Sequence, residues 1–372
     1  MSSGPDRLRV GIATPGGDAP GMNACLRSIV KASRVHTSPT IELVGFLDGA
    51  LGLVRGRKKD IVRVDERLLA DKLDRAGTVL RSARADSLRG ILATPENILL
   101  IAADRIAATC LKQHIKGLVL IGGDTTCEAA RLVSRATDGR VAIVVIPASI
   151  DNDVAGTSTT IGFDSAVEAA VASVDNIRQT AAALGRIFIV ETMGAESGQI
   201  AAHVGLASGA EEVLVPEHGD YSEADLKELA DRLRHRSEQT RSSLVIAAEG
   251  ATFSSAVQTP TERAGSLLER LLRERMPHGT QIRTTILGHL QRGALPTATT
   301  RALAAEAGVL ALDTVYDHCR RISRADSARA KARMVSLHPP AVALRDIPKT
   351  VRRRDRKEVL RLVALQTGRL SY

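Results

Sequence analysis

The chain has 372 residues, of which 44% are hydrophobic and 25% are charged, a composition that indicates a folded globular protein and excludes a disordered one. This length is too great for one ordinary hydrophobic core and predicts two α/β lobes or one large domain. No stretch approaches the roughly 20 apolar residues of a membrane-spanning helix, and the first eight residues carry no secretory apolar region. We therefore expect a cytoplasmic protein with no membrane partner.

The formal net charge of +9 is compatible with an anionic ligand. The densest basic cluster lies in the C-terminal region and consists of Lys349, Arg352, Arg353, Arg354, Arg356, Lys357 and Arg361. Aromatic residues and motifs that are typical of nucleic-acid binding do not accompany it. We expect this cluster to form a solvated, charged C-terminal helix, with nucleic acid an unlikely partner.

Cysteine usage argues against two kinds of stabilising site. Cys25, Cys110, Cys127 and Cys319 lie far apart and form no C-x-x-C pair. This spacing suggests neither a disulfide framework nor a zinc site. We expect four free thiols in or near the core.

Short apolar runs recur along the chain, and most of them precede a loop rich in Gly or Asp and then a helical pattern. Strands are expected at 8–13, 42–46, 117–121, 141–146, 186–190, 213–215, 243–248 and 283–287. Helices are expected at 24–32, at 96–114, from 127 onward, at 165–184 and at 222–235. Repeated strand–loop–helix units predict mostly parallel sheets flanked by helices, in Rossmann-like lobes.

Two glycine loops follow predicted strands. Residues 14–23 (TPGGDAPGMN) lead from the first strand into a helix, and residues 122–126 (GGDTT) repeat that arrangement. Bare backbone N–H groups at a helix N-terminus form a phosphate-binding arrangement, although a glycine turn can also be purely steric.

A third loop, 147–153 (PASIDND), follows the strand at 141–146. Pro147 is expected to end that strand because it has no N–H. In an extended loop Asp151 and Asp153 would point the same way, and a cation or a substrate hydroxyl would relieve their repulsion. The alternative is a loop in which Asp and Asn only stabilise turns.

All three loops should meet at one edge of a sheet, because the carboxyl ends of parallel strands share an edge. The carboxylates of Asp18, Asp124, Asp151 and Asp153 would then converge beside phosphate-binding backbone. Such an arrangement predicts a divalent cation and a phosphoryl group at this edge.

With these motifs assembled, the chain resembles the phosphofructokinase family, whose members phosphorylate fructose 6-phosphate at its 1-hydroxyl. The resemblance extends from about residue 9 to residue 301. It is carried, in order, by 16–23 (GGDAPGMN), 122–124 (GGD), 150–153 (IDND), 193–194 (MG) and 288–293 (GHLQRG). It implies a glycolytic kinase that uses Mg²⁺, with ATP as donor and pyrophosphate as the alternative donor.

The resemblance also assigns roles to single residues. Asp151 matches the general base, Asp153 lies beside the reacting groups, and Asp124 matches the magnesium ligand. The resemblance assigns donor binding to Gly16, Arg84, Gly123, Thr125 and Thr126. It assigns sugar-phosphate binding to Ser149, Arg186, Met193, Glu249, Arg283, His289 and Arg292.

The implied organisation is a larger lobe, 8–162 with 291–341, that binds the donor and Mg²⁺, and a smaller lobe, 163–290 with 342–372, that binds the sugar phosphate. In the family the counterparts of Arg186 and Arg283 come from a neighbouring subunit. The resemblance therefore implies a homo-oligomer, a dimer or a tetramer, with shared active sites.

This chain departs from the family pattern at several positions. Ala195 stands where the family has an arginine after Met-Gly, so one positive charge is missing. Thr125 and Ala148 match neither the ATP-type glycines nor the pyrophosphate-type Asp and Lys. A kinase of another acceptor and a weakened ligand-sensing homologue stay open as alternatives.

The allosteric site of the family is also altered. Arg27, Lys31 and Arg57 are suited to an allosteric site, but Thr240 replaces a basic residue of the family pattern.

Overall fold

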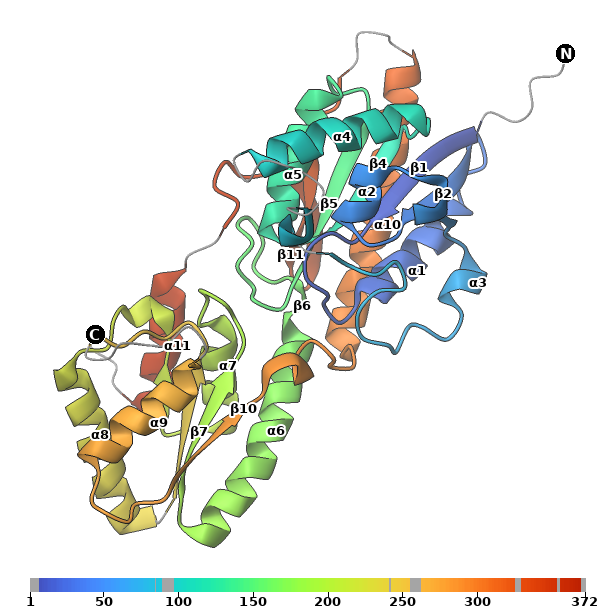
Figure 1. Cartoon of the computed structure of the whole chain (residues 1–372). Helices are drawn as coiled ribbons and strands as arrows, with labels where there is room; N and C mark the ends of the chain where they lie inside the picture. Colours follow the sequence, from blue (N-terminus) through green and yellow to red (C-terminus); the bar gives the residue numbers. More distant parts are fainter. Residues whose placement is uncertain are drawn as a thin grey trace, which may run out of the picture. The chain divides into compact units, whose positions relative to one another are not determined.

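The computed structural model describes residues 7–83, 85–88, 97–240, 242–254, 262–324, 329–352 and 355–368. The chain forms two compact units, each built around its own sheet (Figure 1). Unit 1 comprises residues 1–149, 153–164 and 295–353, and unit 2 comprises residues 150–152, 165–294 and 354–372. The predicted α/β fold class, with two mostly parallel sheets flanked by helices, is confirmed.

The sheet of unit 1 has a parallel centre and antiparallel edges. Its order is β12-β11-β5-β4-β1-β2-β3, with β6 paired to the end of β5. The parallel strands are β1 (Arg7–Ala13), β2 (Thr40–Phe46), β4 (Gly117–Gly122), β5 (Ala142–Ser149), β6 (Ile161–Gly162) and β11 (Arg333–His338), while β3 (Ile61–Arg63) and β12 (Ala341–Asp346) run antiparallel to their neighbours. The chain leaves β1 toward β2 on one side, whereas β4 lies on the other side of β1. The strand order therefore reverses between β1 and β4, and open α/β sheets bind ligands at such a point.

Helices cover both faces of this sheet. Helices α1 (Met22–Ser33) and α10 (Ala298–Arg324) pack against each other, and α10 also lies against β4, β5 and β11. A separate apolar core joins the sheet to α2 (Ala50–Arg55), α4 (Ile98–Lys112) and α5 (Asp124–Ala136) (Figure 1). The short elements of unit 1 are α3 (Glu66–Leu69), η1 (Lys58–Asp60) and η2 (Ala85–Leu88). Every residue of β4 is buried, as expected for a strand covered on both faces.

The four strands of unit 2 are all parallel, in the order β10-β7-β9-β8. They are β7 (Ile187–Thr192), β8 (Glu212–Leu214), β9 (Ser243–Ala248) and β10 (Ile282–Ile286). Helices α8 (Glu223–Thr240) and α9 (Ala264–Arg275) form one apolar core with the sheet, and α7 (Gln199–Ser208) packs against α11 (Arg356–Thr367). The remaining elements are α6 (Phe163–Leu184), η3 (Pro216–His218) and η4 (Gly288–Leu290).

Three expectations about single elements were wrong. Strand β5 continues through Pro147 to Ser149. Proline is tolerated at this position because it lies between the residues that pair with β11, Val144 and Val145, and those that pair with β6, Ala148 and Ser149. The expected C-terminal helix over the whole basic cluster is also wrong, because α11 begins only at Arg356 and residues 349–352 form no helix. Helix α8 extends to Thr240 rather than ending near residue 235.

The segment 342–352 lies in unit 1, although the expected organisation assigned it to the smaller lobe. The reason is strand pairing, since β12 hydrogen-bonds to β11 across six residue pairs, from Arg333 with Asp346 to His338 with Ala341. Strands β3, β11 and β12 were not anticipated. Over the residues described, the structure contains no helix long and apolar enough to cross a membrane.

All four cysteines are free and buried, as predicted. Burial raises the pKa of each thiol to about 12, and for Cys127 the nearby charges of Asp124 and Asp153 act in the same direction. The reactive thiolate is therefore scarce at pH 8, and contact with a reagent requires unfolding.

We expect the native protein to react with Ellman's reagent at pH 8 only on the timescale of unfolding. Addition of a denaturant should release all four thiols, since each of the four cysteines is buried but free. A thiol that reacts within seconds in the native protein would contradict this burial.

Candidate active site

The two glycine loops of unit 1 lie side by side at the switch point between β1 and β4. A Cβ atom on Gly122 would lie 2.4 Å from the carbonyl oxygen of Pro15, so only glycine allows this close approach. Thr126 Oγ1 donates to the same Pro15 oxygen at 3.3 Å, which ties the second loop to the first. Gly16 has φ +99°, and its N–H donates to the carbonyl of Ala83 at 3.1 Å. The backbone around Gly16 and Gly123 is therefore held in position for a phosphate, as a glycine loop requires.

Helix α5 begins at Asp124, directly after Gly123. Asp124 Oδ1 accepts from the N–H of Thr125 at 2.6 Å and from Thr125 Oγ1 at 3.2 Å. The other carboxylate oxygen, Oδ2, pairs with the guanidinium group of Arg352. The side chain of Thr125 is exposed and that of Thr126 is buried.

Ser149 ends β5 beside the second glycine loop, since a Cβ atom on Gly123 would lie 3.8 Å from the Cβ atom of Ser149. Its carbonyl accepts from Thr160 Oγ1 at 2.6 Å, which fixes the end of the strand. The predicted residues Gly16, Gly123, Thr126 and Ser149 are thus brought together at the carboxyl ends of β1, β4 and β5.

The loop that carries Asp151 and Asp153, the two carboxylates predicted to be catalytic, is not extended, contrary to our expectation. Asn152, between Asp151 and Asp153, has φ +52°, in the left-handed region that Asn adopts more readily than most residues. The backbone between Asp151 and Asp153 therefore does not direct the two carboxylates the same way, as an extended chain would. Residues 150–152 belong to unit 2 and Asp153 to unit 1.

Asp124 and Asp153 flank a single guanidinium group. Arg352 Nε lies 3.3 Å from Asp124 Oδ2 and 3.5 Å from Asp153 Oδ2. The side chain of Asp153 is only 11% exposed, so its carboxylate is largely shielded from water. Sequence reasoning assigned Arg352 to a solvated helix and missed its place at this site.

The expected convergence of four carboxylates is not found. Within the described ranges, no three His, Cys, Asp or Glu side chains lie close enough together to hold a metal ion. Asp18 lies instead beside Gly77, where a Cβ atom would be 3.8 Å from its Oδ2. Asp124 with its neighbour Asp153 still suits Mg²⁺, which is commonly bound by one or two carboxylates together with substrate phosphates and water.

Arg84, predicted to bind the donor, lies outside the described residues. The segment that ends at Ala83 is described, and it runs along the first glycine loop, where Thr14 Oγ1 donates to the carbonyl of Arg81 at 2.9 Å.

In unit 2, the residues predicted to contact the sugar lie after the carboxyl ends of three strands. Met193 follows β7, Glu249 follows β9, and His289 and Arg292 follow β10. Glu249 Oε1 accepts from the N–H groups of Gly194 at 3.1 Å and Ala195 at 2.8 Å, so it fixes the loop after β7. Met193 and Arg292 are buried, whereas His289 is exposed.

Arg186 and Arg283 lie at the opposite edge of that sheet. Arg186 directly precedes β7, and Arg283 is the second residue of β10, which pairs in parallel with β7. Arg186 Nε donates to Gln281 Oε1 at 2.5 Å, and Arg283 is exposed. The six residues of β7 separate the two edges by roughly 20 Å at about 3.3 Å per residue. Arg186 and Arg283 therefore lie too far away to contact the same small ligand as Met193 and Glu249 of one chain.

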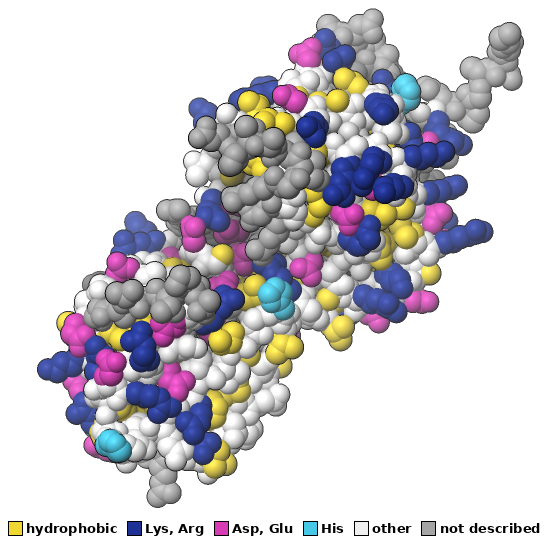
Figure 2. Space-filling view, viewed as in Figure 1, with side chains coloured by type: hydrophobic (Ala, Val, Ile, Leu, Met, Phe, Trp, Pro, Cys, Tyr) yellow, Lys and Arg dark blue, Asp and Glu magenta, His cyan; other side chains and the backbone are white. Residues whose placement is uncertain are grey.

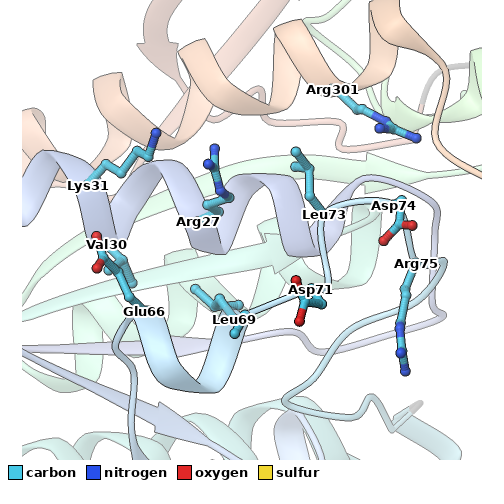
Figure 3. A pocket seen from close by; sticks show the side chains of 11 residues that line it. Arg27, Val30, Lys31, Glu66, Leu69, Asp71, Leu73, Asp74, Arg75 and Arg301 are labelled. Atoms are coloured by element: carbon cyan, nitrogen blue, oxygen red, sulfur yellow. The ribbon is translucent and has the colours of Figure 1, made fainter.

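An open depression of about 760 Å³ lies between α1, α3, the loop after α3 and α10. Arg27 and Lys31, two of the residues expected at the allosteric site, line it together with Arg301 (Figure 3). Arg57 instead pairs with Asp60 at 2.7 Å, a contact that lowers the pKa of that carboxyl. Figure 2 shows Lys and Arg side chains gathered over the part of unit 1 that carries α1 and α3, with Asp and Glu side chains between them. The side chain of Thr240 lies outside the described part of the chain.

The fold and this site together define a doubly wound α/β protein with two glycine loops and a carboxylate pair at its switch point. A family model described as Phosphofructokinase matches residues 9–315. The chain is 34% identical over 310 residues to the ATP-dependent 6-phosphofructokinase of Bacillus licheniformis, covering 83% of this chain and 86% of that protein. The chain therefore belongs to the phosphofructokinase family, a family of kinases.

Solved structures agree with this assignment. The structure of phosphofructokinase from Saccharomyces cerevisiae has a TM-score of 0.75 at 27% identity and is matched over 97% of this chain, which spans about half (47%) of that one. A pyrophosphate-dependent phosphofructokinase from Marinobacter aquaeolei has a TM-score of 0.74 at 18% identity, covering 96% of this chain and 91% of that one. At this lower identity the second comparison shows the likeness of the folds alone.

Proposed function

We propose that the chain is an ATP-dependent 6-phosphofructokinase, which converts fructose 6-phosphate to fructose 1,6-bisphosphate. The observation that carries the proposal is a pair of carboxylates, Asp124 and Asp153, beside the glycine loops of the switch point. The two carboxylates are close enough to share the guanidinium group of Arg352. The names of the curated relatives support the choice of acceptor and donor. The enzyme acts in glycolysis, in the cytoplasm.

In the reaction, the 1-hydroxyl oxygen of the sugar forms a bond to the γ-phosphorus of ATP. The bond from that phosphorus to the β,γ-bridging oxygen breaks, and ADP leaves with the electron pair. Asp151 accepts the proton of the attacking hydroxyl, and Asp153 lies beside the reacting groups. Such transfer depends mainly on positioning and on neutralisation of charge, which backbone N–H groups and cations provide.

Unit 1 binds the donor through Gly16, Arg84, Gly123, Thr125 and Thr126. The N-terminus of α5 and the glycine loops supply N–H groups for its phosphates. Asp124 would hold Mg²⁺, which would neutralise phosphate charge when bound. Ala148 is not a lysine, and the absence of that positive charge favours ATP over pyrophosphate as the donor.

The sugar phosphate is bound by Ser149, Met193, Glu249, His289 and Arg292 of one subunit. Arg186 and Arg283 bind its 6-phosphate in the active site of a neighbouring subunit, since arginine suits a terminal phosphate. The roughly 20 Å between the two edges of the unit 2 sheet supports this division. The active form is therefore a homo-oligomer, a dimer or a homotetramer, with shared sites.

A matrix of donors and acceptors tests this function. The purified chain is assayed with ATP or pyrophosphate against fructose 6-phosphate and other sugar phosphates, with and without Mg²⁺. Turnover that requires Mg²⁺ and is fastest with ATP and fructose 6-phosphate is expected. Absence of turnover with that pair would reject the proposal.

A second candidate is a kinase of the same fold that acts on another acceptor, and Ala195 is the observation that favours it. Ala195 is exposed, its N–H is held by Glu249 at 2.8 Å, and its φ is +52°. Arginine meets the same backbone cost as alanine at this φ, because both carry a Cβ atom. The loop therefore accepts an arginine without a new backbone penalty.

If the chain is a phosphofructokinase that lacks one helpful charge, Ala195→Arg is expected to raise kcat on fructose 6-phosphate. The gain should approach the hundredfold that one well-placed charge is typically worth. Steady-state kinetics of Ala195→Arg and of the uncharged control Ala195→Gln measure it. A rise in KM with no gain in kcat would instead indicate a pocket shaped for another acceptor, and strong wild-type activity unchanged by the substitution would show that Ala195 has little importance.

A further inference from the structure

Arg352 lies outside the residues 9–315 that match the family model, in the segment that follows β12. Its side chain nevertheless reaches the two carboxylates of the switch point, at 3.3 Å from Asp124 and 3.5 Å from Asp153. The ion pair therefore joins the C-terminal part of unit 1 to the proposed catalytic residues.

Backbone contacts hold Arg352 in this position. Arg352 forms an antiparallel bridge with Val154, and the N–H of Ala155 donates to the carbonyl of Val351 at 2.8 Å. Arg131 of α5 donates to the carbonyl of Lys349 at 3.0 Å. The segment is thus attached both to the loop after Asp153 and to the helix that begins with Asp124, so the guanidinium group is positioned by the elements that carry its partners.

The charges around Arg352 would allow its guanidinium group to leave the two carboxylates and bind a phosphate. The two carboxylates carry two negative charges, and the guanidinium group of Arg352 supplies one positive charge. A divalent cation on Asp124 would compete with the guanidinium group for the same oxygen, Oδ2. The side chain of Arg352 is 36% exposed, so it has room to turn toward an incoming phosphate. Planar guanidinium groups bind phosphate oxygens well.

We propose that Arg352 is a phosphate-binding residue of this active site, which leaves the carboxylates and contacts the transferring phosphoryl group when the donor and metal bind. It would supply a positive charge in a chain that has Ala195 where the family has an arginine. This inference rests on the proposed phosphoryl transfer from ATP.

Binding and kinetics of two variants test the role of Arg352. Arg352→Ala and Arg352→Lys are compared with Arg345→Ala, which removes an exposed arginine of the same region that donates to the carbonyl of Gly156 at 2.7 Å. Titration calorimetry with Mg²⁺ measures binding of a non-hydrolysable ATP analogue and of ADP. Because ADP lacks the γ-phosphate, Arg352→Ala should weaken binding of the analogue about tenfold or more and leave ADP binding within about twofold.

In kinetics, Arg352→Ala should lower kcat by about 10²–10³-fold, the usual effect of removing one group that stabilises developing charge. Arg352→Lys should retain part of the rate, millimolar guanidinium should partly rescue Arg352→Ala, and Arg345→Ala should behave like the wild type. Equal weakening of both ligands, or a lower melting temperature without rescue, would indicate a structural role and overturn the proposal. A faster Arg352→Ala enzyme would also overturn it, because the arginine would then block the metal site.

The ligand comparison separates this inference from the proposed function. If the wild type binds the ATP analogue through Arg352 but does not turn over fructose 6-phosphate, only the proposed function fails. If the wild type turns over and Arg352→Ala is unchanged in both assays, only the role of Arg352 fails.

Discussion

Replacing Asp151 by asparagine is expected to lower kcat by about two to four orders of magnitude, the typical cost of removing a general base. Asparagine keeps the size of the side chain but cannot accept the proton of the attacking hydroxyl. KM for fructose 6-phosphate should change little, because a general base acts mainly in the transition state. Steady-state kinetics at saturating Mg-ATP measure both quantities.

Asp138→Asn is a suitable control, since Asp138 pairs with Arg329 and is 73% exposed. It should retain the wild-type rate. If Asp151→Asn kept more than about a third of that rate, far from the loss typical of a general base, Asp151 would have no part in proton transfer.

Mixing two inactive variants is expected to restore activity if the sites are shared. Arg283→Ala damages the 6-phosphate contact that a chain gives to its neighbour, whereas Asp151→Asn damages the site of the chain that carries it. In a mixed dimer, one of the two sites then combines an intact Asp151 with an intact Arg283. Random exchange of equal amounts should recover about a quarter of the wild-type activity, because half of the dimers are mixed and half of their sites are intact.

Differently tagged chains show by co-purification that exchange has occurred. The control is Asp151→Asn with either tag, carried through the same exchange, which should stay inactive. If subunit exchange is proven and the mixture remains as inactive as its two parents, Arg283 does not contribute to the active site of a neighbouring chain.

The sequence was a good guide to the sheets and a poorer guide to the geometry of the site. Strands such as 117–121 and 243–248 could be predicted because strands buried on both faces are continuous apolar runs. The loops after β1 and β4 could be placed together because parallel strands share a carboxyl edge. Local pattern was sufficient for both inferences.

Other features depend on contacts that no local pattern contains. The left-handed backbone at Asn152 changes the directions of Asp151 and Asp153, and the type of residue permits this conformation without requiring it. Arg352 was one of several arginines in a basic stretch, and only the pairing of its segment with Val154 and Ala155 separates it from the others. The short edge strands β3 and β12 were missed because they form by pairing with a neighbour.

The opposite placement of the arginines and the sugar-contacting residues on the unit 2 sheet has a consequence for how such an enzyme behaves in dilute solution. In the proposed oligomer, a single chain would carry two half-sites at opposite ends of β7, and neither of them would be complete. Catalytic competence is then gained on association, so specific activity falls when the protein is diluted below the dissociation constant of its assembly. Substrate that bridges two subunits would in turn favour their association, and it would protect the enzyme from inactivation by dilution.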